Sequence, residues 1–167
     1  MDTMSIRLLL TMFFYWIVAM PTYASIQADC RPSAHSCDFY SCMEDKNPCG
    51  KDGYWLSFGS YYCHSFLVDE PTFSAELQTW LQSVRLCLQQ DLTRPEATAM
   101  SCGQIKRYAV EGHVGCYERT RFCDLRAEDK FWVYWYLRSS ALTPEAWLQA
   151  SRIFASCKKM GHGGGSW

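Results

Sequence analysis

The stretch that decides the fold class is Phe73–Leu92, with the sequence FSAELQTWLQSVRLCLQQDL. Pro71-Thr72 precedes it as a helix start signal, and Thr93-Arg94-Pro95 follows it as a stop signal. Its apolar side chains recur three and four residues apart, the spacing of one face of an α-helix, at Leu77, Trp80, Leu81, Val84, Cys87 and Leu88. The sequence therefore predicts a helix over 73–92.

The same spacing on both sides of this stretch predicts an all-α chain. A last helix is expected to begin at Thr143-Pro144-Glu145, where a capping hydroxyl, a first-turn proline and an acidic residue stand together, and to end near Lys158. Gly112 is expected to separate two further helices. The other predicted helices cover residues 37–43, 54–67, 96–109 and 114–125.

The segment Phe131–Leu137, FWVYWYL, is apolar on every side, so its periodicity does not separate a strand from a buried helix. A helix is favoured, because an isolated strand in an all-α chain has no pairing partner. Such a helix either belongs to the core or forms an interface, and both readings stay open. The candidate interface residues are Phe131, Trp132, Trp135 and Tyr136.

Ten cysteines, an even number, indicate five disulfide bonds in an oxidising compartment. Structural zinc would require close ligand pairs such as C-x₂-C, and none occurs; the four histidines are also far apart in sequence. No metal or cofactor site is therefore expected. The spacing alone does not choose among the possible pairings.

The N-terminal residues 1–24 have the order of a secretory signal peptide. Arg7 precedes the apolar run Leu8–Met20, and Thr22-Tyr23-Ala24 provides the small residues of a cleavage site after Ala24. The alternative is a membrane anchor, but the run is shorter than the about 20 residues that a membrane helix needs. We expect a helical domain over 25–158, a flexible glycine-rich tail over 159–167, and a secreted protein, periplasmic in a bacterium, without a stable membrane anchor.

Charge and motifs argue against nucleic-acid binding and against the common hydrolases. The net charge is −1 with acidic and basic residues mixed, whereas nucleic-acid binding requires a basic face. No G-x-S-x-G occurs, and Cys63-His64-Ser65 lacks the adjacent acid of a secreted phospholipase. A ribonuclease-like pair such as His35 with His113 stays open, because neighbours in space can be distant in sequence. We expect no enzyme and assign no catalytic residue.

Short sequence words, that is, motifs around the cysteines, carry a family resemblance. The spacing of the cysteines carries it as well, with gaps of 24, 15, 14, 7 and 34 residues between successive cysteines from Cys63 to Cys157. Over Cys30–Cys157 the chain resembles the stanniocalcin family of secreted, disulfide-linked proteins. The words are Phe39-Tyr40-Ser41-Cys42-Met43-Glu44, Tyr62-Cys63-His64-Ser65-Phe66, Leu86-Cys87-Leu88, Cys116-Tyr117 and Phe122-Cys123, with Cys49 and Cys102 between them.

The resemblance implies an all-α domain and a non-enzymatic function. Members of the family are homodimeric secreted glycoproteins that act as endocrine or paracrine factors in calcium and phosphate balance, and some restrain a metalloproteinase by binding it. An extracellular protein partner is therefore expected. The implied disulfides join Cys30 to Cys42, Cys37 to Cys63, Cys49 to Cys102, Cys87 to Cys116 and Cys123 to Cys157.

The chain departs from the family in lacking both a glycosylation sequon and the further cysteine that links the family dimer covalently. Any homodimer is therefore expected to be non-covalent. Two alternative functions remain open. One is a small secreted hydrolase on a disulfide scaffold, with His64 and His113 as its candidate groups; the other is a periplasmic inhibitor or immunity-type binding protein.

Overall fold

A computed structural model describes residues 30–94, 97, 99–140 and 143–159 of the chain. The predicted signal peptide, 1–24, lies outside the described residues. So does the predicted tail except for Lys159, which is the last residue of a helix. The boundaries of the mature domain are therefore not described.

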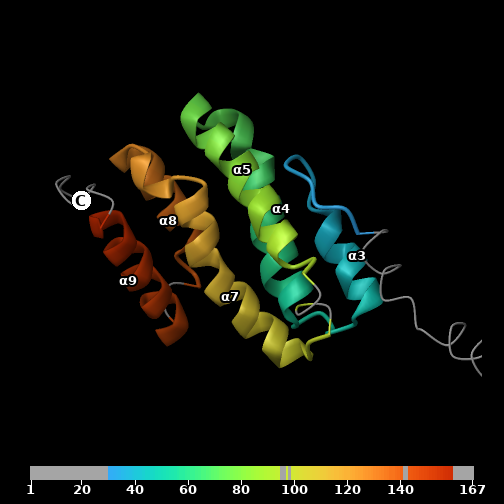
Figure 1. The fold of residues 1–167 in the computed structure, drawn as a ribbon. Helices are drawn as coiled ribbons and strands as arrows, with labels where there is room; N and C mark the ends of the chain where they lie inside the picture. Colours follow the sequence, from blue (N-terminus) through green and yellow to red (C-terminus); the bar gives the residue numbers. More distant parts are fainter. Residues whose placement is uncertain (1–29, 95–96, 98, 141–142, 160–167) are drawn as a thin grey trace, which may run out of the picture.

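All regular structure in the described residues is helical, which confirms the predicted all-α class (Figure 1). A π-helical segment, Trp55–Ser60, leads directly into α4, and short 3₁₀ turns cover Glu70–Thr72 and Phe122–Asp124. The α-helices are α3 (Asp38–Lys46), α4 (Tyr61–Asp69), α5 (Ala75–Asp91), α7 (Cys102–Arg119), α8 (Ala127–Leu137) and α9 (Pro144–Lys159). In Figure 1, α3 and α9 lie at opposite sides of the bundle.

Helix α5 has the predicted position and buries the predicted face. Its cap is Ser74, whose Oγ accepts a hydrogen bond from the Leu77 amide at 3.1 Å and donates to Asp129 Oδ1 at 2.8 Å. The Ser74 hydroxyl thus joins the start of α5 to α8. The buried apolar residues of α5 are Leu77, Trp80, Leu81 and Val84.

The predicted break at Gly112 is wrong, because α7 runs through it as one helix. The helix begins at Cys102 rather than at Glu96, behind a capping box in which Ser101 and Gln104 bond reciprocally. A glycine inside a helix costs about 1 kcal/mol relative to alanine. Burial of one continuous face of α7 outweighs that cost. The buried residues of this face are Ile105, Ala109, His113, Cys116 and Tyr117.

The predicted helix over 114–125 is therefore also wrong. Helix α7 ends at Arg119, and Arg121 adopts a left-handed conformation with φ of 63° that turns the chain. Cys116 lies in α7, whereas Cys123 lies in the 3₁₀ turn that follows. The two cysteines do not share one helix face, and they bond to different partners.

Five disulfides staple the helices, and no cysteine is free. Two of them interlock near the N-terminal end of the described chain, where the Cys37–Cys63 bridge starts inside the loop closed by Cys30–Cys42. The remaining bridges are Cys49–Cys102, Cys87–Cys116 and Cys123–Cys157. This is the pairing that the stanniocalcin resemblance implies.

The core consists of two apolar clusters. One surrounds Tyr54 and Trp55 and includes α3 and the start of α7; the other lies between α5, α7 and α8 around Trp80 and Tyr117. A buried polar contact joins separate segments of the chain: Arg85 of α5 bonds to Glu70 and to the Ala34 carbonyl oxygen.

None of the described helices combines the length and the apolar character needed to cross a membrane.

Candidate interaction surface

Helix α8 is the predicted helix over 131–137, extended at its N-terminal end, and its outward face is aromatic. Val133 is buried at 3 % exposure, whereas Tyr134 is 60 % and Phe131 is 53 % exposed. Trp135 and Trp132 are 45 % and 37 % exposed. We call Phe131, Trp132, Tyr134 and Trp135 the α8 aromatic surface. The segment thus both contributes to the core and presents large apolar side chains to solvent.

Ring contacts order three residues of the α8 aromatic surface, Phe131, Trp132 and Trp135. Phe131 and Trp135 stack one helical turn apart, with ring centroids 6.1 Å from each other. The Trp132 ring lies 6.2 Å from that of Phe73, and the Arg138 guanidinium carbon lies 4.1 Å from the Trp135 ring centroid. Rings that are already positioned lose less conformational entropy when a partner covers them.

Tyr136, the fourth candidate interface residue, has a different role. It is half-buried, and its ring stacks on Phe66 at 4.9 Å and meets Phe73 edge-on at 5.5 Å. Its hydroxyl donates to Asp69 Oδ2. Burial, together with the Asp69 carboxylate, raises the pKa of Tyr136 to about 12. Tyr136 therefore anchors α8 to α4, and the candidates on the open surface are Phe131, Trp132 and Trp135.

An apolar groove separates α8 from α9, with a volume of about 220 Å³. Helix α9 packs against α7 and is tied to the turn after α7 by the Cys123–Cys157 bridge. We call this groove the α8–α9 groove and define it by Tyr117, Phe122, Val133, Leu137, Ile153 and Phe154. Trp147 and Phe154, which also line it, remain 68 % and 51 % exposed.

The groove was not predicted from the sequence, although α9 carries a signal for it. Helix α9 has an apolar face, because its apolar residues recur at helical spacing. These residues are Trp147, Ala150, Ile153 or Phe154, and Cys157. This face forms a groove only because the end of α7 and one side of α8 lie next to it. The spatial relation of these three helices depends on the Cys123–Cys157 bridge, which spacing alone did not assign.

His64 lies on the exposed face of α4 and is held by its own helix. Its Nδ1 lies 2.9 Å from the Ser60 carbonyl oxygen and 3.3 Å from Ser60 Oγ. A carbonyl oxygen only accepts, so Nδ1 carries the proton and does not serve as a base toward the Ser60 hydroxyl. Asp69 lines the same open depression, but it accepts a hydrogen bond from Tyr136.

His113 is buried in α7, where Nδ1 lies 2.6 Å from the Ala109 carbonyl oxygen. Phe58 and Tyr117 meet its ring edge-on at 6.0 and 6.2 Å. Burial lowers its pKa, opposed by the Ala109 hydrogen bond and by Asp91. His35 is exposed near the start of the described chain. Within the described residues, no hydrogen bond or ring contact joins these histidines to one another.

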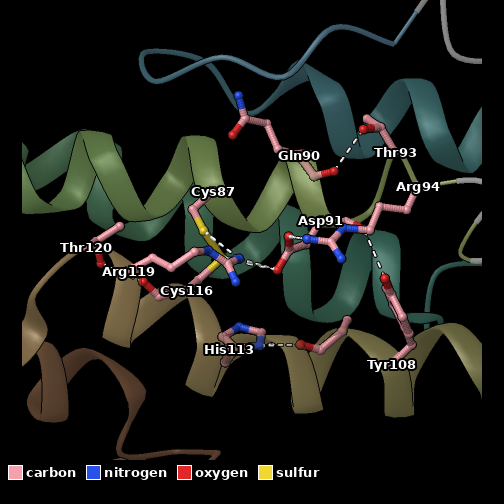
Figure 2. Close-up of polar contacts among 11 residues, drawn as sticks. Cys87, Gln90, Asp91, Thr93, Arg94, Tyr108, His113, Cys116, Arg119 and Thr120 are labelled. Atoms are coloured by element: carbon pink, nitrogen blue, oxygen red, sulfur yellow. Dashed lines mark hydrogen bonds and ion pairs between the residues drawn. A yellow bond between two sulfur atoms is a disulfide. The ribbon is translucent and has the colours of Figure 1, made fainter. Parts of the chain in front are cut away.

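Asp91 lies at the centre of a polar cluster on the joint between α5 and α7 (Figure 2). Its carboxylate pairs with Arg94 at 2.8 Å and with Arg119 at 2.6 Å. The Arg119 Nη2 atom also lies 3.0 and 3.1 Å from the sulfurs of Cys87 and Cys116, so its guanidinium covers that disulfide. The cluster ties the two helices together.

Cys87, Asp91 and Cys116 meet the spacing of a metal site, with one ligand atom of each within 4.8 Å of the others. Their chemistry argues against that use. Metals bind the thiolate form of cysteine, and both sulfurs here are consumed by a disulfide. The Asp91 carboxylate is already neutralised by two arginines. We interpret the cluster as structural.

Comparisons with known proteins found no matching family model, no matching curated protein and no matching solved structure.

Proposed function

We propose that this chain is a secreted, non-enzymatic protein on a stanniocalcin-like scaffold, and that it acts by binding an extracellular protein through the α8 aromatic surface. The observation that carries the proposal is the exposure of four neighbouring aromatic residues on one helix that is itself anchored in the core. Aromatic residues are enriched at protein interfaces, where they supply most of the binding energy.

The compartment and the scaffold are supported by separate observations. The N-terminal residues have the order of a signal peptide, and five disulfides favour an oxidising compartment. The disulfide pairing agrees with the one that the stanniocalcin resemblance implies. The resemblance adds a hormone-like or regulatory role, with calcium or phosphate balance as its outcome.

The hydrolase alternative has little support from the geometry of the histidines. A nucleophilic mechanism needs a base with a free ring nitrogen toward the nucleophile and an acid that orients the base. His64 donates from Nδ1 to the Ser60 carbonyl oxygen, and within the described residues no hydrogen bond joins its Nε2 to a hydroxyl or an acid. His113 is enclosed by aromatic rings in the core. We therefore propose a binding function and no turnover.

Site-specific photo-cross-linking tests the proposal on the mature protein. Benzoylphenylalanine in place of Phe131, added to the extracellular fluid of the host, should form one dominant cross-linked product. The same probe in place of Arg94, which is exposed and lies outside α8, is the positional control. An excess of unlabelled wild-type protein should abolish the product. The double variant Phe131→Ser, Trp135→Ser should compete at least tenfold less well.

Three results have defined meanings. Equal competition by the double variant would show that the α8 aromatic surface is not the binding site. A product of twice the chain mass would identify the partner as a second copy, that is, a non-covalent homodimer. Steady turnover of a substrate that disappears in His64→Ala or His113→Ala would contradict the non-enzymatic proposal and favour the hydrolase.

A further inference from the structure

The α8–α9 groove is lined mostly by apolar side chains. It runs between α8 and α9. On α9 the lining residues extend from Ala146 to Cys157, which corresponds to about 16 Å along the helix axis. Val133 and Leu137 form one wall, and Ile153 and Phe154 form the other. Water gains few hydrogen bonds along such a lining, so covering it with an apolar ligand is favourable.

The volume limits what the groove can hold. At about 220 Å³ it exceeds the roughly 150 Å³ of an engineered cavity that binds benzene. A helix with its side chains is about 10 Å wide, so a bound helix would have to sit above the groove rather than inside it. A single extended alkyl chain is much thinner than a helix and suits a groove of this volume.

Among the lining side chains that the structure describes, Lys130 is the charged one, and it marks one end. Lys130 stands one helical turn before Tyr134 on α8, and its Nζ donates to the Cys123 carbonyl oxygen at 2.8 Å. Cys123 is bonded to Cys157, which lines the same end. A single positive charge at the end of an apolar groove complements an amphiphile with one negative charge on its head.

We propose that the α8–α9 groove binds a fatty acid, with the alkyl chain between α8 and α9 and the carboxylate beside Lys130. A carboxylate is chosen over a phosphate head group because the described part of the lining supplies one cation. The chain would cover the parts of Trp147 and Phe154 that are exposed to solvent. The groove shares Tyr134 with the α8 aromatic surface, but the inference does not depend on the protein partner proposed above.

Calorimetric titration of the mature protein tests the proposal, with decanoate, decanol and decyltrimethylammonium as probes below their micelle concentrations. We expect saturable one-to-one binding of decanoate. Decanol should bind about fivefold more weakly, since it lacks the ion pair. Decyltrimethylammonium should bind more weakly still. No saturable binding of decanoate, or equal affinity for all three head groups, would overturn the proposal.

Two matched pairs of variants locate the site. Ala150 lines the groove and is exposed, so Ala150→Trp should fill the groove without disturbing the core and weaken decanoate binding at least tenfold. Ala155 is exposed on the same helix but does not line the groove, so Ala155→Trp should bind as the wild type does. Unchanged binding by Ala150→Trp would overturn the proposed site.

The second pair tests the head group. Lys130→Gln should weaken decanoate binding about fivefold and leave decanol binding unchanged. Lys158→Gln removes an exposed charge on α9 that does not line the groove, and it should change neither. An equal loss for decanoate and decanol in Lys130→Gln would show that Lys130 shapes the groove rather than pairing with a carboxylate, and would overturn the head-group assignment.

Discussion

The ion pair of Glu70 and Arg85 is buried, with their side chains 10 % and 4 % exposed. Arg85 also donates to the Ala34 carbonyl oxygen, and Gln82 donates to Glu70 Oε1 at 2.8 Å. The pair therefore joins the segment before α3, the turn before α5 and α5 itself. A buried charge that loses its partner is costly, because water does not replace the lost interaction.

Glu70→Gln should lower the free energy of unfolding by about 3 kcal/mol, because it leaves the Arg85 charge uncompensated. Urea denaturation of the disulfide-intact protein measures the loss. Arg121→Gln is the control: it breaks the exposed pair of Arg121 with Asp124 and should cost no more than about 1 kcal/mol. Similar losses in the two variants would contradict the structural importance assigned to the buried pair.

His113 should make the stability of the fold depend on pH. Its pKa in the folded protein lies below the ordinary value of 6.5 because of burial, so the unfolded chain binds the proton more readily. Stability should therefore fall as the pH drops below about 6.5, by up to about 1.4 kcal/mol per pH unit until the folded-state pKa is reached.

The measurement compares urea midpoints at pH 7.5 and 5.5 for the wild type and for His113→Gln, which does not titrate. The wild type should lose more stability than the variant over this range. If His113→Gln retained the full dependence, other groups would be responsible for it.

At the scale of elements, the sequence predicted helices where local signals and burial agree. Helix α5 has a serine cap, a face of regularly spaced apolar residues and a clear stop. Helix α7 was predicted as two pieces because Gly112 is a poor helix former. What keeps α7 intact is tertiary: the buried face that continues past Gly112 packs against α5. A single sequence does not show that neighbour.

The α8 aromatic surface was only partly predictable from the sequence, because it also depends on which neighbouring elements cover α8. A helix was predicted over Phe131–Leu137 because an isolated strand would lack a pairing partner, and its composition places large apolar residues on all sides. Which of those residues are covered depends on where α4 and the turn before α5 lie, and this places Tyr136 against Phe66 and Phe73. Phe131 and Trp135 have no such cover and stay exposed.

Two glycine substitutions test how helices tolerate their glycines. A Cβ on Gly112 would meet only Asp91 Oδ2 at 3.7 Å, an ordinary contact, so Gly112→Ala should stabilise the protein by about 0.5–1 kcal/mol. A Cβ on Gly59 would lie 2.5 Å from the Tyr40 ring, so Gly59→Ala should destabilise it by about 1–3 kcal/mol.

Calorimetric melting of both variants gives the signs directly. The melting temperature should rise by a few degrees for Gly112→Ala and fall for Gly59→Ala. A fall for Gly112→Ala would mean that α7 needs a glycine at this position for a reason other than helix propensity.

At the scale of the whole molecule, the five disulfides differ in what they hold. The bridges Cys37–Cys63, Cys49–Cys102 and Cys87–Cys116 connect segments that already pack together in the two core clusters. Cys123–Cys157 also belongs to the second core cluster and ties down α9, on which Cys157 is the one buried residue among those with described side chains. The bundle is therefore expected to consist of a core that includes α7 and an outer helix that depends on one bridge.

Cys123→Ser combined with Cys157→Ser tests this division. The bridge closes a loop of 34 residues, and its removal frees about 4 kcal/mol of chain entropy in the unfolded state. Because α9 buries little, that loss should appear as local release of α9, with fast amide exchange in α9 and preserved protection in α5 and α7. Decanoate binding should be lost, because the groove loses one wall. Equal loss of protection in all three helices would instead mean that α9 and the core fold as one unit.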